Sequence, residues 1–358
     1  VGSEMCIRDR NAILGNSGNY DAVVSNAFGT IVSGTVVVAV VPNQAPRFNE
    51  PRGIILDPAG NLYVSDWNAN TVRKITPSGI VSTLAGTPGS AAFSSGAGQN
   101  VHFAGPFGLA QDRQGNIYVA DMYQEAIRKI TPGGVVSVLA GTPGVYGTTD
   151  GVGSAALFTF PRGVAVDGIG NVFVTDTNNA TIRKIAPNGQ SSTFAGQVGV
   201  GGYADGTGSA AQFSVPVGIA IGANGDLYVA DAGNHVIRKI TPNGVVTTFA
   251  GLAATPGSVD GSAGSARFNA PQGVALDNAG NLYVADTANH SIRKITPAGT
   301  VTTVAGYSGN LGYADGFGNY ARFYNPHGVF VDTSNNIYVA DTYNHVIRKI
   351  APNGYVTT

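Results

Sequence analysis

The chain has 358 residues, of which 43% are aliphatic or aromatic and only 11% are charged. This composition can bury a large core, while the net charge of −1 gives no electrostatic argument for nucleic acid or an anionic membrane surface. The single cysteine, Cys6, excludes an internal disulfide and a metal site built from several cysteines. No run of 18 apolar residues occurs, so we expect no membrane insertion.

The first ten residues, 1–10, match nothing later in the chain. We expect them to be a non-native leader of the kind carried by environmental (metagenomic) sequence fragments, and we leave them out of the fold prediction. The same expectation implies that the natural N-terminus is truncated and that any signal peptide is hidden.

Residues 11–40 differ in pattern from everything that follows. Gly18-Asn19-Tyr20, followed by Val23 to Gly29 and a run rich in Thr and Val, resembles the last hairpin of a bacterial immunoglobulin-like domain. Tyr20 stands where such domains place their corner tyrosine, and a valine replaces the disulfide cysteine. We expect a C-terminal fragment of such a domain, joined by a linker at 41–47 to the remaining chain.

From residue 48 onward, one unit recurs six times in a fixed register. The triplet Pro-x-Gly returns at every 55th residue, beginning at Pro51, Pro106, Pro161, Pro216, Pro271 and Pro326. An aspartate that ends a Tyr/Phe-Val-x-Asp run returns in step, as Asp66, Asp121, Asp176, Asp231, Asp286 and Asp341. An Arg-Lys pair also repeats, from Arg73-Lys74 to Arg348-Lys349. We place the repeat starts near residues 48, 103, 158, 213, 268 and 323.

Each unit contains four short apolar segments. The first segment is 163–166 in the third unit, and the second, third and fourth segments are 281–285, 292–295 and 301–304 in the fifth unit. Asp-x-x-Gly-Asn separates the first two segments, and Thr/Ala-Pro-x-Gly separates the last two; both are turn sequences. The pattern predicts four antiparallel strands in each unit. In Ile-Arg-Lys-Ile of the third segment, the two isoleucines point to opposite faces, so both faces of each sheet must be covered.

Six such sheets predict an all-β, six-bladed β-propeller, because radial repetition covers sheet faces and leaves few exposed edges. The unit Phe-x-x-Pro-x-Gly-Val-Ala-x-Asp-x-x-Gly-Asn-Leu-Tyr-Val-Ala-Asp-x-x-Asn-His-x-Ile-Arg-Lys also resembles the NHL repeat, over residues 48–358. The last three units keep the Asn-His pair, as in Asn234-His235. The first three units depart there, with Ala69-Asn70, Gln124-Glu125 and Asn179-Ala180.

The loops between second and third strands, and the long crossovers between blades, fall on one face of a propeller. They are longer and more variable than the turns on the opposite face, so we expect binding residues there. Only the start of the first strand lies close enough to the axis for six residues to meet one ligand. That position is the x of Pro-x-Gly: Arg52, Phe107, Arg162, Val217, Gln272 and His327.

We predict that these six residues form a ligand-binding channel mouth, the alternative being solvated filler without a ligand. The two arginines suit a carboxylate or another anion. Trp67, Met122, Tyr123 and Tyr343, in the loops between second and third strands, are predicted as secondary contacts.

The recurring aspartates invite a metal or acid–base interpretation, but a structural one is favoured. An aspartate at a strand end accepts hydrogen bonds from amides of the following loop, and it can pair with the third-strand arginine. His235, His290 and His345 are too far apart, in separate blades, to share a zinc ion. We expect turn roles for the crossover Asp-Gly pairs, at Asp150, Asp205, Asp260 and Asp315, and buried positions between blades for Phe103, Phe158, Phe213, Phe268 and Phe323.

These features favour a non-catalytic binding scaffold of a bacterial secreted or cell-surface protein, with a protein or glycan as ligand. We expect a monomeric propeller within a larger multidomain chain, with no cofactor and no nucleic acid partner; a structural calcium ion is the one metal left open. The alternative is a propeller lyase or hydrolase with a metal in the central channel, since some propellers that resemble this one are enzymes.

Overall fold

The computed structural model describes residues 18–20, 23–26, 29–32, 36–38, 48–91 and 93–358. The chain divides into two compact units, Val1–Arg47 and Phe48–Thr358. In the first unit, β1 (Gly18–Tyr20) pairs with β4 (Val36–Val38), and β2 (Val23–Asn26) pairs with β3 (Gly29–Val32), both antiparallel. The immunoglobulin-like assignment of 11–40 stays a prediction, and the predicted leader (1–10) and linker (41–47) lie outside the described residues.

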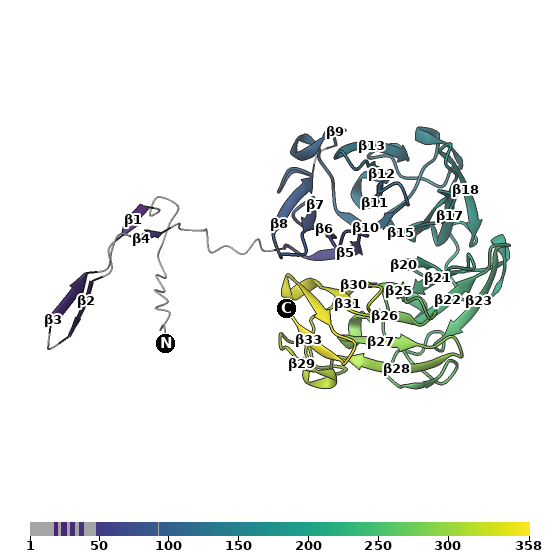
Figure 1. Ribbon diagram of the computed structural model, residues 1–358. Helices are drawn as coiled ribbons and strands as arrows, with labels where there is room; N and C mark the ends of the chain where they lie inside the picture. The colour runs from purple at the N-terminus through teal and green to yellow at the C-terminus, as the bar shows by residue number, and fades with distance from the viewer. Residues whose placement is uncertain (1–17, 21–22, 27–28, 33–35, 39–47, 92) are drawn as a thin grey trace. The chain divides into compact units, whose positions relative to one another are not determined.

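The second unit is an all-β propeller of six antiparallel sheets, or blades, set radially about an axis (Figure 1). The innermost strands are β5 (Pro51–Leu56), β10 (Pro106–Gln111), β15 (Pro161–Val166), β20 (Pro216–Ile221), β25 (Val274–Leu276) and β30 (Pro326–Val331). The second strands are β6 (Leu62–Asp66), β11 (Ile117–Asp121), β16 (Val172–Asp176), β21 (Leu227–Asp231), β26 (Leu282–Asp286) and β31 (Ile337–Asp341). We number the blades 1 to 6 in this order.

The outer half of each blade continues the same antiparallel order. The third strands are β7 (Thr71–Ile75), β12 (Ala126–Ile130), β17 (Thr181–Ile185), β22 (Val236–Ile240), β27 (Ser291–Ile295) and β32 (Val346–Ile350). The fourth strands are β8 (Val81–Ala85), β13 (Val135–Ala140), β18 (Gln190–Ala195), β23 (Val245–Ala250), β28 (Thr300–Ala305) and β33 (Tyr355–Thr357). The all-β, six-bladed fold predicted from the sequence is thereby confirmed.

Blades 2 to 6 carry a fifth, two-residue strand that the sequence pattern did not predict. Each comes from the crossover that enters the blade and pairs with the blade's fourth strand. These strands are β9 (Gly96–Ala97), β14 (Gly151–Val152), β19 (Gly206–Thr207), β24 (Gly261–Ser262) and β29 (Gly316–Phe317). Two residues are too few to show the alternation that marks a strand in a sequence.

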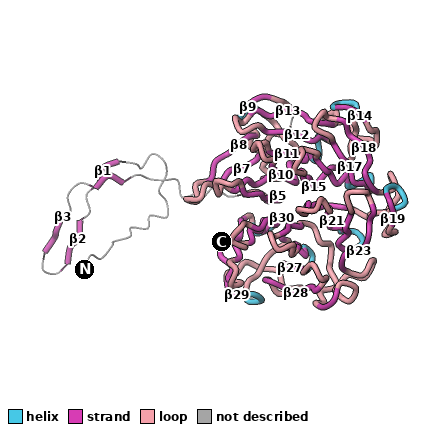
Figure 2. Tube along the Cα trace, turned by 45° about the vertical axis from the view of Figure 1, so that its right-hand side comes forward, coloured by secondary structure: helices cyan, strands magenta, loops and turns pink. Residues whose placement is uncertain are grey.

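Helical residues in the described part of the chain are confined to single 3-10 turns, drawn in cyan in Figure 2. The turns that precede innermost strands are η2 (Gly98–Asn100), η4 (Gly153–Ala155), η6 (Gly208–Ala210) and η9 (Gly318–Tyr320). Those that follow second strands are η3 (Met122–Gln124), η5 (Thr177–Asn179), η7 (Ala232–Asn234), η8 (Thr287–Asn289) and η10 (Thr342–Asn344). A helix long and apolar enough to cross a membrane is not found among the described residues.

The turn sequences fold as predicted. In blade 1, the amide of Gly60 donates to the carbonyl of Asp57 at 3.0 Å, and Gly60 has a φ of 82°. Asn335 takes the same left-handed conformation in blade 6, with a φ of 62°. The Asp57 carboxylate accepts from the amides of Ala59 and Asn61, so it fixes the turn that joins β5 to β6.

The core lies between the blades. The predicted phenylalanines are fully buried, and Phe103, for example, packs against Val72 of blade 1 and Ile117 of blade 2. In blades 2 to 5, both isoleucines of the third strand, such as Ile127 and Ile130, have no exposed surface, so both faces of these sheets are covered.

The ring closes between blades 6 and 1. The Thr342 hydroxyl donates to the carbonyl of Pro51 at 2.7 Å, and the Glu50 amide donates to Nδ1 of His345 at 3.1 Å. Phe48 and Ile54 belong to one apolar cluster with Tyr338 of blade 6. Closure places the starts of all six innermost strands around a single axis.

Candidate ligand site at the channel mouth

The Pro-x-Gly triplet sets the spacing of the blades at the axis. The glycine of each triplet faces the carbonyl oxygen of the x residue in the next blade, as Gly53 faces Phe107 and Gly328 faces Arg52. A Cβ atom on any of these glycines would overlap that oxygen. The glycine is therefore required for close packing of neighbouring innermost strands, and it leaves the preceding x residue to point into the channel.

A cavity of about 270 Å³ opens at the end of the channel where the innermost strands begin. It is lined by five of the six predicted mouth residues, namely Arg52, Phe107, Arg162, Gln272 and His327. The sixth, Val217, lines a narrower space of about 70 Å³ next to it, together with the triplet glycines. Trp67, Met122, Tyr123 and Tyr343, the predicted secondary contacts, line the larger cavity as well. The structure thus brings the predicted residues together, while their role in binding stays a prediction.

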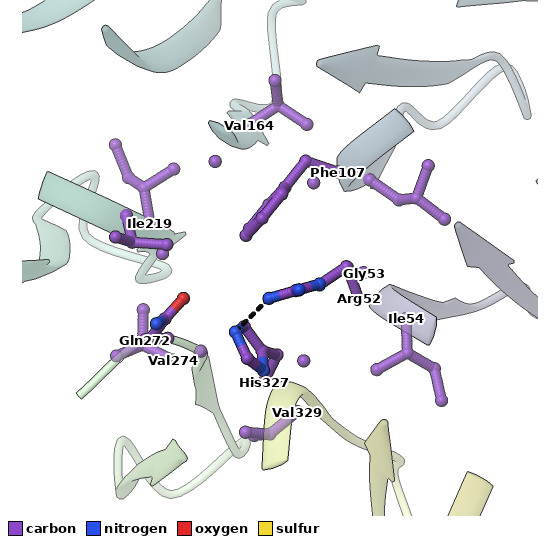
Figure 3. Close-up of a pocket in the computed structure, with 17 residues that line it drawn as sticks. Arg52, Gly53, Ile54, Phe107, Val164, Ile219, Gln272, Val274, His327 and Val329 are labelled. Carbon is purple, nitrogen blue, oxygen red and sulfur yellow. Dashed lines mark hydrogen bonds between the residues drawn. The ribbon is translucent and has the colours of Figure 1, made fainter. Parts of the chain in front are cut away.

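Arg52 is held in place by its neighbours. Its guanidinium forms an ion pair with Glu50 at 3.0 Å and a short hydrogen bond with Nε2 of His327 (Figure 3). The guanidinium carbon also lies 4.8 Å from the ring centre of Trp67 and 5.5 Å from that of Phe107. Both terminal nitrogens of the Arg52 guanidinium are therefore engaged within the protein, while its Nε has no partner among the described residues.

Arg162 differs, because its guanidinium has no hydrogen-bond or ion-pair partner among the described residues. It does contact the aromatic ring of Phe107, whose centre lies 5.6 Å from the guanidinium carbon. Burial lowers the pKa of Arg162, and the positive charge of Arg52 lowers it further. Gln272 also presents a buried Oε1 atom without a partner in the described part of the chain. A half-buried cation and a buried amide oxygen are each costly without a partner unless a ligand or water completes their hydrogen bonds.

His327 is neutral in this arrangement. Burial places the pKa of His327 well below its usual value, and the charges of Arg52 and Arg162 act in the same direction. Its Nδ1 lies 2.9 Å from the carbonyl of Asn325, so Nδ1 carries the proton, and Nε2 accepts from Arg52. Both ring nitrogens are therefore engaged within the protein.

Aromatic side chains cover one side of the mouth. The rings of Trp67 and Tyr123 lie 5.9 Å apart, and Tyr123 meets Phe160 edge-on at 5.8 Å. Thr177, Thr287 and Thr342 share the repeat position of Trp67, and each donates to a proline carbonyl of the next blade. Trp67 and Met122 have thus replaced a structural threonine with a large side chain that faces the cavity.

Gly105 makes room for the large side chains that replace the threonine. A Cβ on Gly105 would lie 2.7 Å from Tyr123 and 2.9 Å from Trp67, so the aromatic pair requires glycine beneath it. Glu50, Phe160, Val215, Ala270 and Asn325 occupy the same repeat position in the other five blades.

The ring of predicted structural aspartates is buried, and each pairs with the third-strand arginine of its blade, at 2.8 to 3.4 Å. In blades 3 to 6, an asparagine side-chain amide of the following loop donates to the aspartate as predicted, for example from Asn289 to Asp286 at 2.8 Å, but the prediction was incomplete. The backbone amide that each aspartate binds lies 17 residues earlier, in the preceding crossover, as Asn269 donates to Asp286 at 2.7 Å. The fold brings this distant segment back over the end of the second strand, which local sequence cannot show.

The predicted turn role of the crossover aspartates was also incomplete. Asp150, Asp205, Asp260 and Asp315 each pair with a buried third-strand arginine, at 2.6 to 2.8 Å. In blade 2, the equivalent residue is Ser95, whose hydroxyl lies 3.4 Å from the Arg128 guanidinium, and Arg128 keeps the contact with the preceding carbonyl, that of Ser94, at 2.6 Å. Each of these arginines therefore ties the end of the second strand to the crossover.

The repeated histidines join adjacent blades. Nδ1 of His235 accepts from the Ala270 amide at 3.0 Å, and Nδ1 of His290 accepts from the Asn325 amide at 3.2 Å. Burial lowers the pKa of both histidines, which favours the neutral form that this contact needs. Asn70 and Glu125 accept in the same way in blades 1 and 2.

Sequence reasoning missed Glu50, Thr287 and Asn325 at the mouth. Thr287 and Asn325 line the cavity, and Glu50 pairs with Arg52. Glu50 and Asn325 directly precede the Pro-x-Gly triplet, so the variation at that position was the signal that could have found them.

A family model described as NHL repeat matches residues 158–185, 213–240, 268–295 and 323–350. These four units are NHL repeats. Blades 1 and 2 repeat the same pattern in the same register of 55 residues.

Curated relatives share the repeats over part of their length. Human NHL repeat-containing protein 2 is 27% identical over 270 residues, which are 66% of this chain and 37% of that protein. Protein SUPPRESSOR OF QUENCHING 1 of Arabidopsis thaliana is 35% identical over 155 residues, which are 40% of this chain and 15% of that protein. The NHL chain therefore spans well under half the length of these relatives.

Solved structures of low sequence identity share the fold. An auxiliary nutrient binding protein from Bacteroides thetaiotaomicron superposes with a TM-score of 0.64 at 19% identity, covering 85% of this chain and 69% of that one. Virginiamycin B lyase from Staphylococcus aureus has a TM-score of 0.54 at 17% identity, covering 88% of this chain and 84% of that one.

Proposed function

We propose that the NHL propeller is a non-catalytic binding scaffold whose channel mouth holds an anionic group of its ligand. The observation that carries this proposal is Arg162, a half-buried guanidinium without a polar partner among the described residues, set in a cavity of about 270 Å³. Guanidinium groups bind carboxylates through two parallel hydrogen bonds, and burial strengthens that interaction.

The other mouth residues can contact the part of the ligand that is attached to its anionic group. Trp67, Phe107 and Tyr123 offer aromatic surface, and Gln272 offers an amide that has an unsatisfied oxygen. A cavity of this size takes one amino acid side chain or one sugar unit rather than a large cofactor. A terminal or side-chain carboxylate of a protein, or an acidic sugar of a glycan, fits both requirements.

An exported or cell-surface location belongs to the same proposal. The nutrient-binding proteins of known structure that share the propeller fold with this chain come from Bacteroides. Capture of an external protein or glycan is consistent with a rigid ring that presents one variable face.

The competing function is a propeller lyase, because the fold is shared with virginiamycin B lyase. The arrangement of His327 favours binding over this alternative. A general base needs a free nitrogen lone pair near its substrate, whereas Nε2 of His327 already accepts from Arg52.

The experiment is a calorimetric titration of the full chain with benzoate, and with benzamide as the neutral analogue of the same shape. We expect saturable binding of benzoate, little binding of benzamide, and loss of benzoate binding in an Arg162→Gln variant. The thermal stability of that variant should be equal to or higher than that of the wild type, because Arg162 makes no hydrogen bond or ion pair with any described residue and its burial without a partner is costly.

The matched control is Arg113→Gln, which removes an exposed arginine from the turn between β10 and β11. This variant should leave benzoate binding unchanged, since Arg113 is not among the residues that line the mouth. Equal binding of benzoate by wild type and Arg162→Gln would disprove the proposal.

A further inference from the structure

Blade 1 differs from the other five at its outer edge. Its sheet has only four strands, and the edge strand β8 has no fifth strand paired with it among the described residues. In blades 2 to 6, the crossover supplies that strand, and its aspartate or serine meets the third-strand arginine.

Arg73 is the third-strand arginine of blade 1, and it holds only one carboxylate of the described part of the chain. It contacts Asp66 at 3.4 Å, whereas Arg293 of blade 5 contacts Asp286 at 2.8 Å and Asp260 at 2.6 Å. The side chain of Arg73 is 14% exposed, compared with 1% for Arg293. No described residue of blade 1 thus takes the place of the second carboxylate.

A second feature of blade 1 points to the same missing carboxylate. Thr303 of blade 5 donates to Asp260 through its amide at 2.9 Å and through its hydroxyl at 3.1 Å. Thr193, Thr248 and Thr358 make the corresponding hydroxyl contact in blades 3, 4 and 6.

In blades 3 to 6, this fourth-strand threonine occurs together with an aspartate in the crossover. Blade 2 has Ser95 in place of that aspartate and Val138 in place of the threonine. Blade 1 has Thr83 at this position, paired across the sheet with Arg73. Blade 1 therefore has both the arginine and the threonine that bind the crossover carboxylate in blades 3 to 6.

The fourth-strand valine that pairs with the fifth strand in other blades is also less buried in blade 1. Val136, Val246, Val301 and Val356 are almost completely buried beneath the fifth strands of their blades. Val81, the equivalent residue of blade 1, is only partly buried. The chain's residues at the repeat positions of Asp260 and Gly261 are Val40 and Val41, which offer no carboxylate.

We propose that the outer edge of blade 1 is a second binding site, which takes an extended peptide strand containing Asp-Gly from a separate polypeptide. The aspartate binds Arg73 and Thr83, and the residues after it pair with β8, as β24 pairs with β28 in blade 5. The glycine is needed because Gly261 has a φ of 141°, a conformation that other residues rarely adopt.

The test uses the full chain and a fluorescein-labelled synthetic peptide of residues 255–267, with binding followed by fluorescence anisotropy. We expect saturable binding that an Asp260→Asn peptide weakens about tenfold or more, because the charge-assisted contact with Arg73 is lost. A Gly261→Ala peptide should also bind more weakly.

On the protein side, Thr83→Val should weaken binding of the unmodified peptide several-fold and leave the fold intact, since Thr83 lies at the rim of the sheet. The matched control is Thr303→Val, which changes the same position in a blade whose carboxylate is already present. Absence of saturable binding, as would occur if another part of the chain covers β8, overturns the proposal. Equal affinity for the Asp260→Asn peptide overturns it as well.

Discussion

Single neighbouring side chains determine which arginines of the channel mouth are paired within the protein and which have no polar partner among the described residues. Arg52 and Arg162 occupy the same repeat position and line one cavity, yet Arg52 is engaged by Glu50 and His327 while Arg162 has no such partner among the described residues. The sequence shows two equivalent arginines at the mouth. Only the packed neighbours distinguish the arginine that is paired within the protein from the one that we propose binds a ligand.

Glu125 provides a test of charge at the same scale. It is 5% exposed, its Oε2 accepts from the Phe160 amide at 2.6 Å, and it has no cationic partner among the described residues. Burial raises the pKa of Glu125 to about 7. The folded state therefore binds this proton more tightly than the unfolded state, in which the ordinary value of 4.5 applies, so stability falls as pH rises between those two values.

We predict that Glu125→Gln raises the free energy of unfolding by about 1–3 kcal/mol at about pH 8 and leaves it nearly unchanged at about pH 4.5. Glutamine keeps the acceptor for the Phe160 amide but carries no charge. Urea unfolding at both pH values measures the difference. The same gain at both values would show that the effect does not come from ionisation.

At the scale of strands and turns, the repeated pattern predicted more of the fold than of its cross-connections. Four strands and two turns per unit follow from local alternation and turn residues, such as Asp57 and Gly60, which act within a few positions. The two-residue fifth strands and the Arg293–Asp260 pair depend on segments about 30 or more residues apart. Local pattern carries no signal for contacts of that kind.

The Pro-x-Gly glycines should be intolerant of a side chain. In Gly218→Ala, the new Cβ would overlap the Gln272 carbonyl of the next blade and crowd Gly273. We predict a loss of about 2–3 kcal/mol in the free energy of unfolding, as for other overpacked sites. Gly264→Ala is the control, because a Cβ there meets no atom within 4 Å. Equal stability of the two variants would refute close blade packing as the reason for the glycine.

In blades 3 to 6, the two carboxylates that pair with the third-strand arginine should contribute unequally to stability. Asp286 is fully buried, pairs with Arg293 at 2.8 Å, and accepts from the Asn269 amide and the Asn289 side chain, so Asp286→Ala leaves these buried donors without their acceptor and should cost about 3–5 kcal/mol of stability. Asp260 is 46% exposed, and serine already serves at its position in blade 2. Asp260→Ser should therefore cost about 1 kcal/mol or less, as a surface ion pair does. Denaturant unfolding of both variants tests this order, and a reversed order would contradict it.

At the scale of the whole molecule, closure of the ring converts six separate positions into one site. The mouth residues lie 55 residues apart in sequence, and the contact between blades 6 and 1 brings His327 to Arg52 across 275 residues. The grouping could be predicted from the repeat number alone, because six blades form a closed ring. The asymmetry of the mouth could not, since it depends on how large side chains such as Trp67 and Tyr123 pack over Gly105.

The most direct test of the account is a crystal structure of the protein soaked with para-iodobenzoate, with the iodine located by its anomalous signal. The account predicts a closed six-bladed ring with the iodine in the mouth cavity and the carboxylate on the Arg162 guanidinium. An empty mouth with the iodine bound elsewhere, or an open ring in which the Pro-x-Gly residues do not converge, would contradict it.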